Sequence, residues 1–493
     1  MSLLRKLASD TAVYGVSNIL SRLLNYIVMT PFLTRNFSTS EYGAVTDIFV
    51  YAAFLTIVFT YRLDTAFFRF GSNAEAREAA FGTAWQSLLA TTVALVGGLV
   101  LFAPQLAALM YYPEHPEYVW WLAGIVGADA LSSVPFARLR LENKAKQFAA
   151  IKLVNVLINS SLVIFFLSYC PTKAASENSF IQAIYKPEYR ISYVFIANLA
   201  ASLLTLLLLS PALLRLSLRF ERALWQRMMR YSLPLLLVSF AGMINEVLDR
   251  NLLKIYLPGS LPDRLHEIGI YGAAYKIPTL MMIFTTAFNY AAEPIFFSQA
   301  DKSDAKLLYA RTAHIFSIVA SLGFLGILLY LDILQYLLGK DFREGLQIVP
   351  ILLLANVFFG MYNSFSIWYK LSDRTIIGTY IAFGGAAITL IINILGIPYY
   401  GYWASAWATL ACYAFICTAT YALGQRYYPV PYPMKRISTY IATAVGLFIL
   451  SKGLKTMLLN ELPIGYSLVV NTFILASFLF FIFLLERKKG ILG

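Results

Sequence analysis

The chain has 493 residues, of which 59% are hydrophobic and only 13% charged, and its net charge is +13. A soluble domain carries about 25% charged residues, so this composition excludes a soluble protein, a disordered chain and a disulfide scaffold. Long apolar runs, in place of short alternating strands, exclude a β-barrel. The sequence therefore predicts an all-α polytopic membrane protein.

A membrane helix needs about 20 mainly apolar residues to cross about 30 Å of hydrocarbon. This length predicts fourteen spans, with twelve as the alternative count. The predicted spans are 11–33, 42–61, 80–103, 119–137, 148–169, 191–214, 231–256, 269–297, 308–331, 347–369, 376–398, 402–424, 438–457 and 465–485.

The loop charges predict which side of the membrane each end of the chain faces. With the N-terminus in the cytoplasm, the inner segments carry 25 Lys and Arg residues and the outer segments carry 9. Because Lys and Arg concentrate in cytoplasmic loops, this bias predicts that both termini face the cytoplasm. Cys170 then lies outside, where an impermeant thiol reagent is expected to reach it.

No loop exceeds about 25 residues, which leaves no room for a soluble catalytic domain. The basic segment 215–230 (RLSLRFERALWQRMMR) is either an interfacial helix or an ordinary positive-inside loop. The predicted organisation has an N-lobe of six helices, a linker, a C-lobe of six helices and a final helix pair. These parts are residues 1–215, 216–230, 231–424 and 425–493.

Two stretches of the sequence resemble each other at an offset of 229 residues. They are EYGAVTDIF (41–49) and IYGAAYKIP (270–278). Each lies near the start of a six-span half, so the halves form a parallel pseudo-repeat. Transporters built from such repeats bind substrate between their halves and expose it alternately to each side.

Arg22 lies 11 residues from either end of its predicted span, roughly 16 Å deep and therefore near the midplane. A lipid-facing charge at that depth costs roughly 3 kcal/mol, so Arg22 is expected to face protein or water. Asn18, Arg22 and Asn25 share one helix face. Asp129, in the fourth span, is the plausible partner if Arg22 instead forms a structural salt bridge.

Other charges lie in or beside the spans. The seventh span contains Asn245, Glu246, Asp249, Arg250 and Lys254, the eighth contains Lys276, and Arg62 and Arg69 lie at the inner end of the second. Glu246 precedes Arg250 by four residues, the favourable order for an intrahelical pair. Together the cations form a ladder from the inner to the outer face, which suits an anionic substrate such as a phosphate.

The intramembrane carboxylates support a different interpretation. Asp47, Asp129, Glu246, Asp249 and Glu293 could form a cation or proton site, or they could pair with the arginines. The three cysteines and three histidines show no metal-binding spacing, and no Walker A motif is present, so no metal or cofactor is expected. A membrane enzyme acting on glycans is the alternative from another functional class.

The chain resembles bacterial polysaccharide flippases of the multidrug/oligosaccharidyl-lipid/polysaccharide exporter superfamily. The resemblance runs in order over nearly the whole chain. Besides Arg22, it is carried by TPFLTRNFSTSEYG (30–43), RLDTAFFRF (62–70), FARLRLENKAKQFAAIKLVN (136–155), DRNLL (249–253), IGIYGAAYKIP (268–278) and IPYYGYWASAWATL (397–410).

The resemblance implies two six-helix lobes around a central cavity, with a C-terminal helix pair. It also implies movement of an undecaprenyl-diphosphate-linked oligosaccharide to the outer leaflet of the cytoplasmic membrane, alongside glycosyltransferases and a polymerase. Family precedent places cavity arginines at Arg22 and Arg62, and more loosely cations at Arg250 and Lys276. Export of drugs with cation coupling, and flipping of a peptidoglycan precursor, are the alternatives within the superfamily. No nucleic-acid partner is expected.

Overall fold

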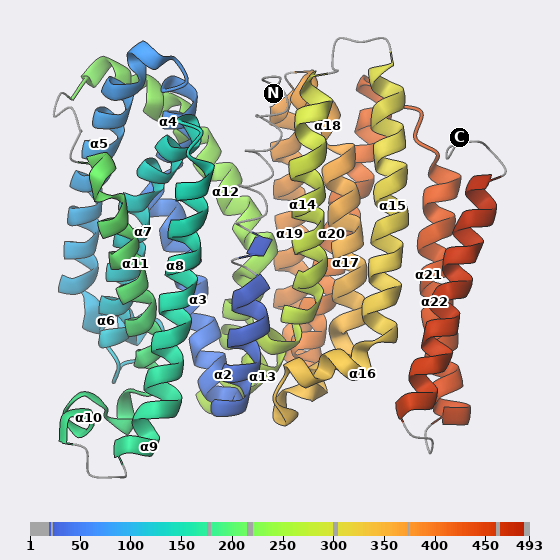
Figure 1. The fold of residues 1–493 in the computed structure, drawn as a ribbon, viewed down its shortest axis with the longest axis horizontal. Coiled ribbons are helices and arrows are strands. Elements are labelled where there is room, and N and C mark those ends of the chain that lie inside the picture. Colours follow the sequence, from blue (N-terminus) through green and yellow to red (C-terminus); the bar gives the residue numbers. More distant parts are fainter. Residues whose placement is uncertain are drawn as a thin grey trace. The chain divides into compact units, whose positions relative to one another are not determined.

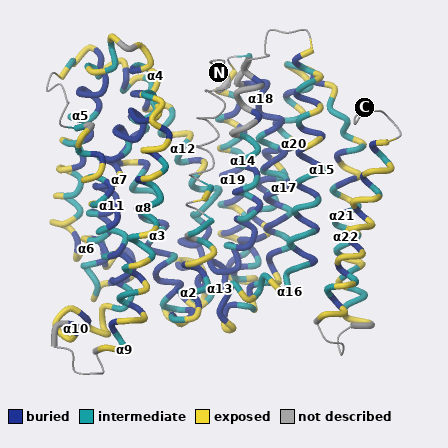
Figure 2. The backbone as a smooth tube through the Cα atoms, in the orientation of Figure 1, coloured by how far each residue is buried: buried dark blue, intermediate teal, exposed yellow. Residues whose placement is uncertain are grey.

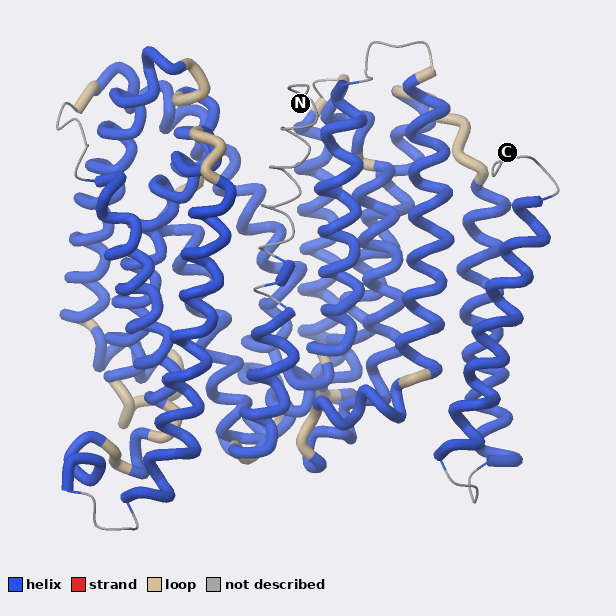
Figure 3. The backbone as a smooth tube through the Cα atoms, in the orientation of Figure 1, coloured by secondary structure: helices blue, strands red, loops and turns tan. Residues whose placement is uncertain are grey.

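The computed structural model describes residues 19–20, 23–174, 179–213, 220–298, 304–372, 374–459 and 464–487. Within these ranges the regular secondary structure is entirely helical (Figures 1 and 3). Contacts divide the chain into two compact units, Met1–Gly269 and Ile270–Gly493. The predicted lobe boundary at 216–230 stays a prediction.

The first unit contains the helices of the predicted N-lobe together with the seventh span. Its described helices are η1 (Asn25–Met29), α2 (Thr30–Asn36), α3 (Thr39–Thr60), α4 (Leu63–Phe70), α5 (Ala74–Leu101), α6 (Ala103–Leu109), α7 (Glu117–Leu141), α8 (Ala145–Ile164), η2 (Phe165–Tyr169), α9 (Cys170–Ala174), α10 (Ser179–Ile184), η3 (Pro187–Tyr189), α11 (Ser192–Leu213) and α12 (Arg222–Tyr256). The next helix, α13 (Leu261–Ala274), starts in this unit and ends in the second.

Helix α3 has a defined start and a defined break. The Ser38 side chain accepts a hydrogen bond from the Glu41 amide while the Glu41 carboxylate accepts one from the Ser38 amide, a capping box. At the other end, Tyr61 and Arg62 have φ angles of 31° and 57°. Because these left-handed angles cannot continue a right-handed helix, the two residues end α3 and redirect the chain into α4.

Buried apolar side chains hold the break in place. Phe67 of α4 packs on Phe81 of α5, with ring centroids 5.7 Å apart, and Met228 of α12 belongs to the same buried cluster. The Tyr61 hydroxyl lies 2.8 Å from Ser87 Oγ, which also accepts a hydrogen bond from the Trp225 indole. Figure 2 shows the buried faces of these helices.

Helices α3 and α13 cross at two glycines, Gly43 and Gly269. A Cβ atom on Gly43 would lie 3.1 Å from the Gly269 amide nitrogen, and the reverse distance is also 3.1 Å. Two hydrogen bonds support the crossing: Thr39 Oγ1 to His266 Nδ1 at 2.5 Å, and Ser40 Oγ to the Pro262 carbonyl at 3.0 Å.

The second unit contains the remaining spans. Its described helices are α14 (Lys276–Ser298), α15 (Ala305–Leu329), α16 (Leu331–Leu334), η4 (Gln335–Leu337), η5 (Lys340–Ile348), α17 (Val349–Phe365), α18 (Ile367–Leu371), α19 (Thr375–Tyr400), α20 (Tyr402–Tyr427), α21 (Met434–Leu454), η6 (Lys455–Leu459) and α22 (Ile464–Arg487). Buried polar contacts attach the last helix to α15: His314 Nε2 lies 2.9 Å from Glu486, and Asn471 donates to the Leu329 carbonyl at 2.6 Å.

The described residues contain 12 helices long and apolar enough to cross a membrane, and the bent pair α13 and α14 makes 13. Of the remaining predicted span, 11–33, residues 11–18 and 21–22 lie outside the described residues. The prediction of an all-α polytopic membrane protein with about 14 helices is therefore confirmed. Predicted and observed ends agree within a few residues for most spans, for example 402–424 against Tyr402–Tyr427.

Two local features differ from expectation. Residues 222–230 form the first turns of α12, continuous with the seventh span, because residues 223–233 contain neither glycine nor proline and the helix continues through Pro234. Whether residues 216–230 link two lobes stays a prediction. Cys170 is fully buried, so the expectation that a thiol reagent reaches it was wrong. Its loop position suggested exposure, but its side chain packs inside the unit.

Candidate functional site

A buried ion pair joins α3 and α12 in the first unit. Lys254 Nζ lies 2.5 Å from Asp47 Oδ2, and neither side chain has any exposed surface. Lys254 also donates to the Tyr51 hydroxyl at 3.0 Å and to the Met110 carbonyl at 3.1 Å. The ammonium group therefore has a partner for each of its three hydrogens.

Tyrosine side chains surround this pair. The Tyr112 hydroxyl donates to Asp47 Oδ2 at 2.9 Å. The rings of Tyr51, Tyr112 and Tyr111 have their centroids 4.8, 5.1 and 5.8 Å from Lys254 Nζ, within the range of cation–π attraction. Asp47 Oδ1 is buried and has no hydrogen-bond partner among the described residues. The Asp47 carboxylate is thus compensated on one oxygen only.

A buried ion pair is held by mutual compensation rather than by a large net gain. Two charges lose their hydration on burial, and their attraction roughly repays that cost when the geometry is good. Removing one partner leaves the other buried and uncompensated. The Asp47–Lys254 pair therefore favours a state in which α3 and α12 stay together at this point.

One turn before Lys254, three predicted site residues come together on α12. Arg250 Nη1 lies 3.1 Å from Asp249 Oδ1 and donates to the Glu246 carbonyl oxygen at 3.1 Å. Asp249 and Arg250 are buried, whereas Glu246 is partly exposed. Glu246 and Arg250 keep the predicted spacing of four residues, and Arg250 contacts the backbone oxygen of Glu246.

Arg62 and Arg69 lie at the other end of α3, where the chain bends into α4. Arg62 is the first residue before α4, is half-buried, and its buried Nε has no hydrogen-bond partner among the described residues. Arg69 is exposed and its guanidinium lies 4.5 Å from the centre of the Tyr231 ring. Asp47 and Arg62 are 15 residues apart, about 22 Å along a helix.

The other predicted site residues are separate from these groups or lie outside the described residues. Asn18 and Arg22 are outside the described ranges, and Asn25 begins η1. Asp129 lies on the surface of the first unit, close to Ser202 and Lys152. Lys276 is half-buried at the start of α14, in the second unit. Their roles stay predictions.

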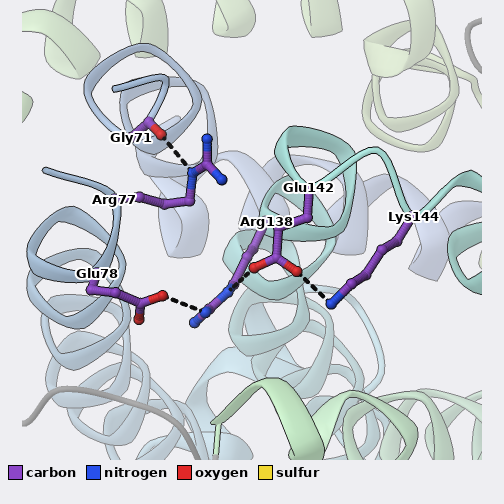
Figure 4. Close-up of polar contacts among 6 residues, drawn as sticks. All are labelled: Gly71, Arg77, Glu78, Arg138, Glu142 and Lys144. Atoms are coloured by element: carbon purple, nitrogen blue, oxygen red, sulfur yellow. Dashed lines mark hydrogen bonds and ion pairs between the residues drawn. The ribbon is translucent and has the colours of Figure 1, made fainter. Parts of the chain in front are cut away.

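A second charged cluster lies where α7 ends, beside the start of α5 (Figure 4). Arg138, itself buried, contacts Glu78 at 2.5 Å and Glu142 at 2.6 Å, and Lys144 Nζ lies 2.6 Å from the second Glu142 oxygen. Burial raises the pKa of the Glu142 carboxyl, but its hydrogen bonds with Lys144 and Arg138 outweigh this, and the pKa lies below 4.5. This cluster joins α5 to α7.

The comparisons with known proteins agree with this architecture. Residues 7–300 match the sequence profile of the polysaccharide biosynthesis protein family. The chain belongs to this family. A search of the curated proteins finds no significant match.

The fold of this member of the polysaccharide biosynthesis family also matches solved transporter structures. The Lipid II flippase MurJ in an inward closed conformation matches with a TM-score of 0.70 and 15% identity, over 96% of this chain and 99% of that chain. An inward-facing multidrug resistance MATE family transporter of the MOP superfamily matches with a TM-score of 0.66 and 12% identity, over 86% and 99%. The chain therefore shares the fold of these two solved transporter structures.

Within this family member, the pairing of Asp47 with Lys254 is the site feature that sequence reasoning missed. Both residues stood out as charges inside predicted spans, but the arginines were considered as partners for Asp47. Lys254 sits four residues after Arg250 on the same helix face, which was the available signal. Among the described residues, no cluster of three His, Cys, Asp or Glu side chains could hold a metal ion.

Proposed function

We propose that this protein moves an undecaprenyl-diphosphate-linked oligosaccharide from the cytoplasmic to the outer leaflet of the inner membrane by alternating access. Surface polysaccharide biosynthesis would use the product, with glycosyltransferases and a polymerase as pathway partners. Both termini are proposed to face the cytoplasm. The membership of the polysaccharide biosynthesis family and the flippase fold support this proposal.

The observation that carries the proposal is Arg62. It lies at the break between α3 and α4, half-buried, and its guanidinium makes no ion pair or hydrogen bond with the described residues. A guanidinium in that state favours an anionic ligand, and its forked donors match phosphate oxygens. Arg62 is therefore proposed as the inner contact of the diphosphate, with Arg69 beside it and Arg22 further along the path.

The Asp47–Lys254 pair is proposed to control the alternation between the closed and open states of the outer end. Asp47 belongs to the predicted N-lobe and Lys254 to the predicted C-lobe, so the pair holds the two predicted lobes together at the predicted outer end. Opening that end separates the pair and leaves Lys254 without Tyr51, Met110 and Asp47. A diphosphate arriving there supplies a replacement anion, so cargo favours opening.

The test is flipping in proteoliposomes that contain a short-chain prenyl-diphosphate oligosaccharide. Arg62→Gly removes the charge and keeps a residue suited to the left-handed backbone, while Arg62→Lys keeps the charge without the fork. We expect at least a tenfold slower flipping for Arg62→Gly, a smaller loss for Arg62→Lys, and loss for Arg22→Ala. Thermal melting checks that Arg62→Gly is folded. Normal flipping by the folded variant contradicts the proposal.

The same assay separates the alternatives. A peptidoglycan precursor offered in place of the oligosaccharide tests the related flippase activity. A cation-coupled multidrug exporter predicts efflux of lipophilic cations that is lost in Asp249→Asn. The close contact of Asp249 with Arg250 argues against that second function, because the carboxylate is already compensated.

A further inference from the structure

A pocket opens at the end of the first unit where α3 begins and α6 ends, the end predicted to face outward. Its volume is about 370 Å³, within the range of small-ligand sites. Three tyrosines, two glutamates and a histidine line it together with apolar side chains. These polar and aromatic lining residues are Glu41, Tyr111, Tyr112, Glu114, His115 and Tyr118.

Tyr111 is held in an unusual backbone conformation at this pocket. Its φ angle is 66°, and 44% of its surface is exposed although it is a large aromatic residue. Residues other than glycine and asparagine disfavour this left-handed region. Residues held in it against that preference concentrate at functional sites. The conformation follows α6, where the Tyr112 amide bonds back to the Ala107 carbonyl at 2.8 Å. Tyr111 thus lines the pocket with nearly half of its surface exposed.

The charges around the pocket are largely compensated. Glu41 bonds to the Ser38 amide at 2.8 Å and pairs with Arg190 at 3.4 Å, and Glu117 holds His115 Nδ1 at 2.8 Å. The Glu114 carboxylate is exposed and makes no hydrogen bond or ion pair with the described residues. The pocket is therefore lined by aromatic side chains and one uncompensated carboxylate, while the other charged groups around it are paired.

We infer that this pocket binds a neutral saccharide, with the Tyr111 ring against a sugar face and Glu114 accepting hydrogen bonds from sugar hydroxyls. A pyranose has an apolar C–H face and a rim of hydroxyls, which matches an aromatic surface beside a carboxylate. This inference rests on the proposed function: the ligand is the glycan of a cargo molecule on the product side.

The pocket also contacts the buried ion pair. The Tyr112 hydroxyl bonds to Asp47, and the Tyr111 ring lies 5.8 Å from Lys254 Nζ. A ligand that rests on Tyr111 therefore touches a residue next to the pair that holds α3 to α12. Glycan binding and the state of this pair share the same two tyrosines.

The experiment measures binding of maltose and of N,N′-diacetylchitobiose to the purified full-length protein by saturation-transfer NMR in a sugar-free detergent. Tyr111→Gly removes the ring at a position whose backbone suits glycine, and Glu114→Gln removes the charge. Tyr189→Ala is the matched control, because Tyr189 is 45% exposed in η3 of the same unit and does not line the pocket. Tetraphenylphosphonium tests whether the pocket takes a cation instead.

We expect at least one disaccharide to bind, with affinity reduced about tenfold or more in Tyr111→Gly, equivalent to about 1.4 kcal/mol. Glu114→Gln is expected to weaken binding and Tyr189→Ala to leave it unchanged. No disaccharide binding, binding of the cation alone, or equal binding by Tyr111→Gly overturns the inference. Flipping is measured separately. Intact flipping without sugar binding contradicts this inference and leaves the proposed function standing. Sugar binding without flipping contradicts the proposed function and leaves the saccharide pocket standing.

Discussion

Gly43 and Gly269 face each other where α3 crosses α13, so closely that a Cβ atom on either would overlap a backbone carbonyl of the opposite helix. The overlapped oxygens belong to Leu265 and Thr39. Small residues let membrane helices approach at this distance, and the gain comes from backbone packing. Gly43 stands in the first copy of the repeated sequence, so one repeat supplies half of this crossing.

Gly43→Ala is expected to destabilise the protein by about 1–3 kcal/mol, because the methyl group forces the two backbones apart. Gly97→Ala in α5 is the matched control, since a Cβ atom there meets nothing within 4 Å. It is expected to be neutral or stabilising by up to about 1 kcal/mol, as alanine favours a helix interior. Thermal melting in detergent compares the two. Equal melting temperatures would show that the crossing is loose.

Neutralising one member of the buried ion pair is expected to cost about 3–5 kcal/mol, whether by Asp47→Asn or by Lys254→Met. The double variant should recover much of that loss, because neither charge is then left buried alone. A double-mutant cycle of unfolding free energies measures the coupling. Additive losses in the cycle contradict a direct pairing. A folded double variant also permits a flipping measurement without the pair.

The charged cluster of Glu78, Arg138, Glu142 and Lys144 is expected to make the stability of the fold depend on pH. Because the pKa of Glu142 lies below 4.5 in the folded protein, its ion pairs stabilise the fold above that pH and are lost as the pH falls through the folded value. Glu142→Gln should destabilise the fold at pH 7 by about 1 kcal/mol or less, and should match the unchanged protein once the pH is below the folded pKa. Glu344→Gln, at an exposed site, should show no such convergence.

Single-cysteine labelling is expected to establish the orientation in the membrane. The three native cysteines are buried, so background labelling should be low. Glu188→Cys and Lys146→Cys place thiols at exposed positions predicted to lie outside and inside, respectively. An impermeant maleimide on intact cells should label the first alone, and the second only after permeabilisation. The reverse pattern contradicts the predicted topology.

The spans could be predicted from the sequence because each must supply about 20 apolar residues on its own. Local signals also located the charges inside them, including Asp47 and Lys254. The partner of Asp47 could not be predicted, because it depends on which two helices meet 207 residues apart in the chain. The left-handed turn at Tyr61 and Arg62 was equally hidden, since neither residue type favours that conformation.

The candidate site was predicted in part. Glu246, Asp249 and Arg250 were expected on one helix and lie together there, because helical spacing alone brings them close. The predicted ladder of cations needs the arrangement of different helices, which hydropathy does not supply. Arg22 and Asn18 lie outside the described residues, and the diphosphate roles of Arg62, Arg69, Arg250 and Lys276 stay predictions.

The distance in sequence between Asp47 and Lys254 has a consequence for biosynthesis. At about 5–20 residues per second, a ribosome needs roughly 10–40 s to make the 207 residues that separate them. During that interval α3 is inserted without the cation that later neutralises its carboxylate. Tyr112 follows Asp47 by only 65 residues, so its hydroxyl is the earlier partner available to the nascent chain. Loss of the Tyr112 hydroxyl would therefore lower the efficiency of membrane insertion more than it lowers the stability of the finished protein.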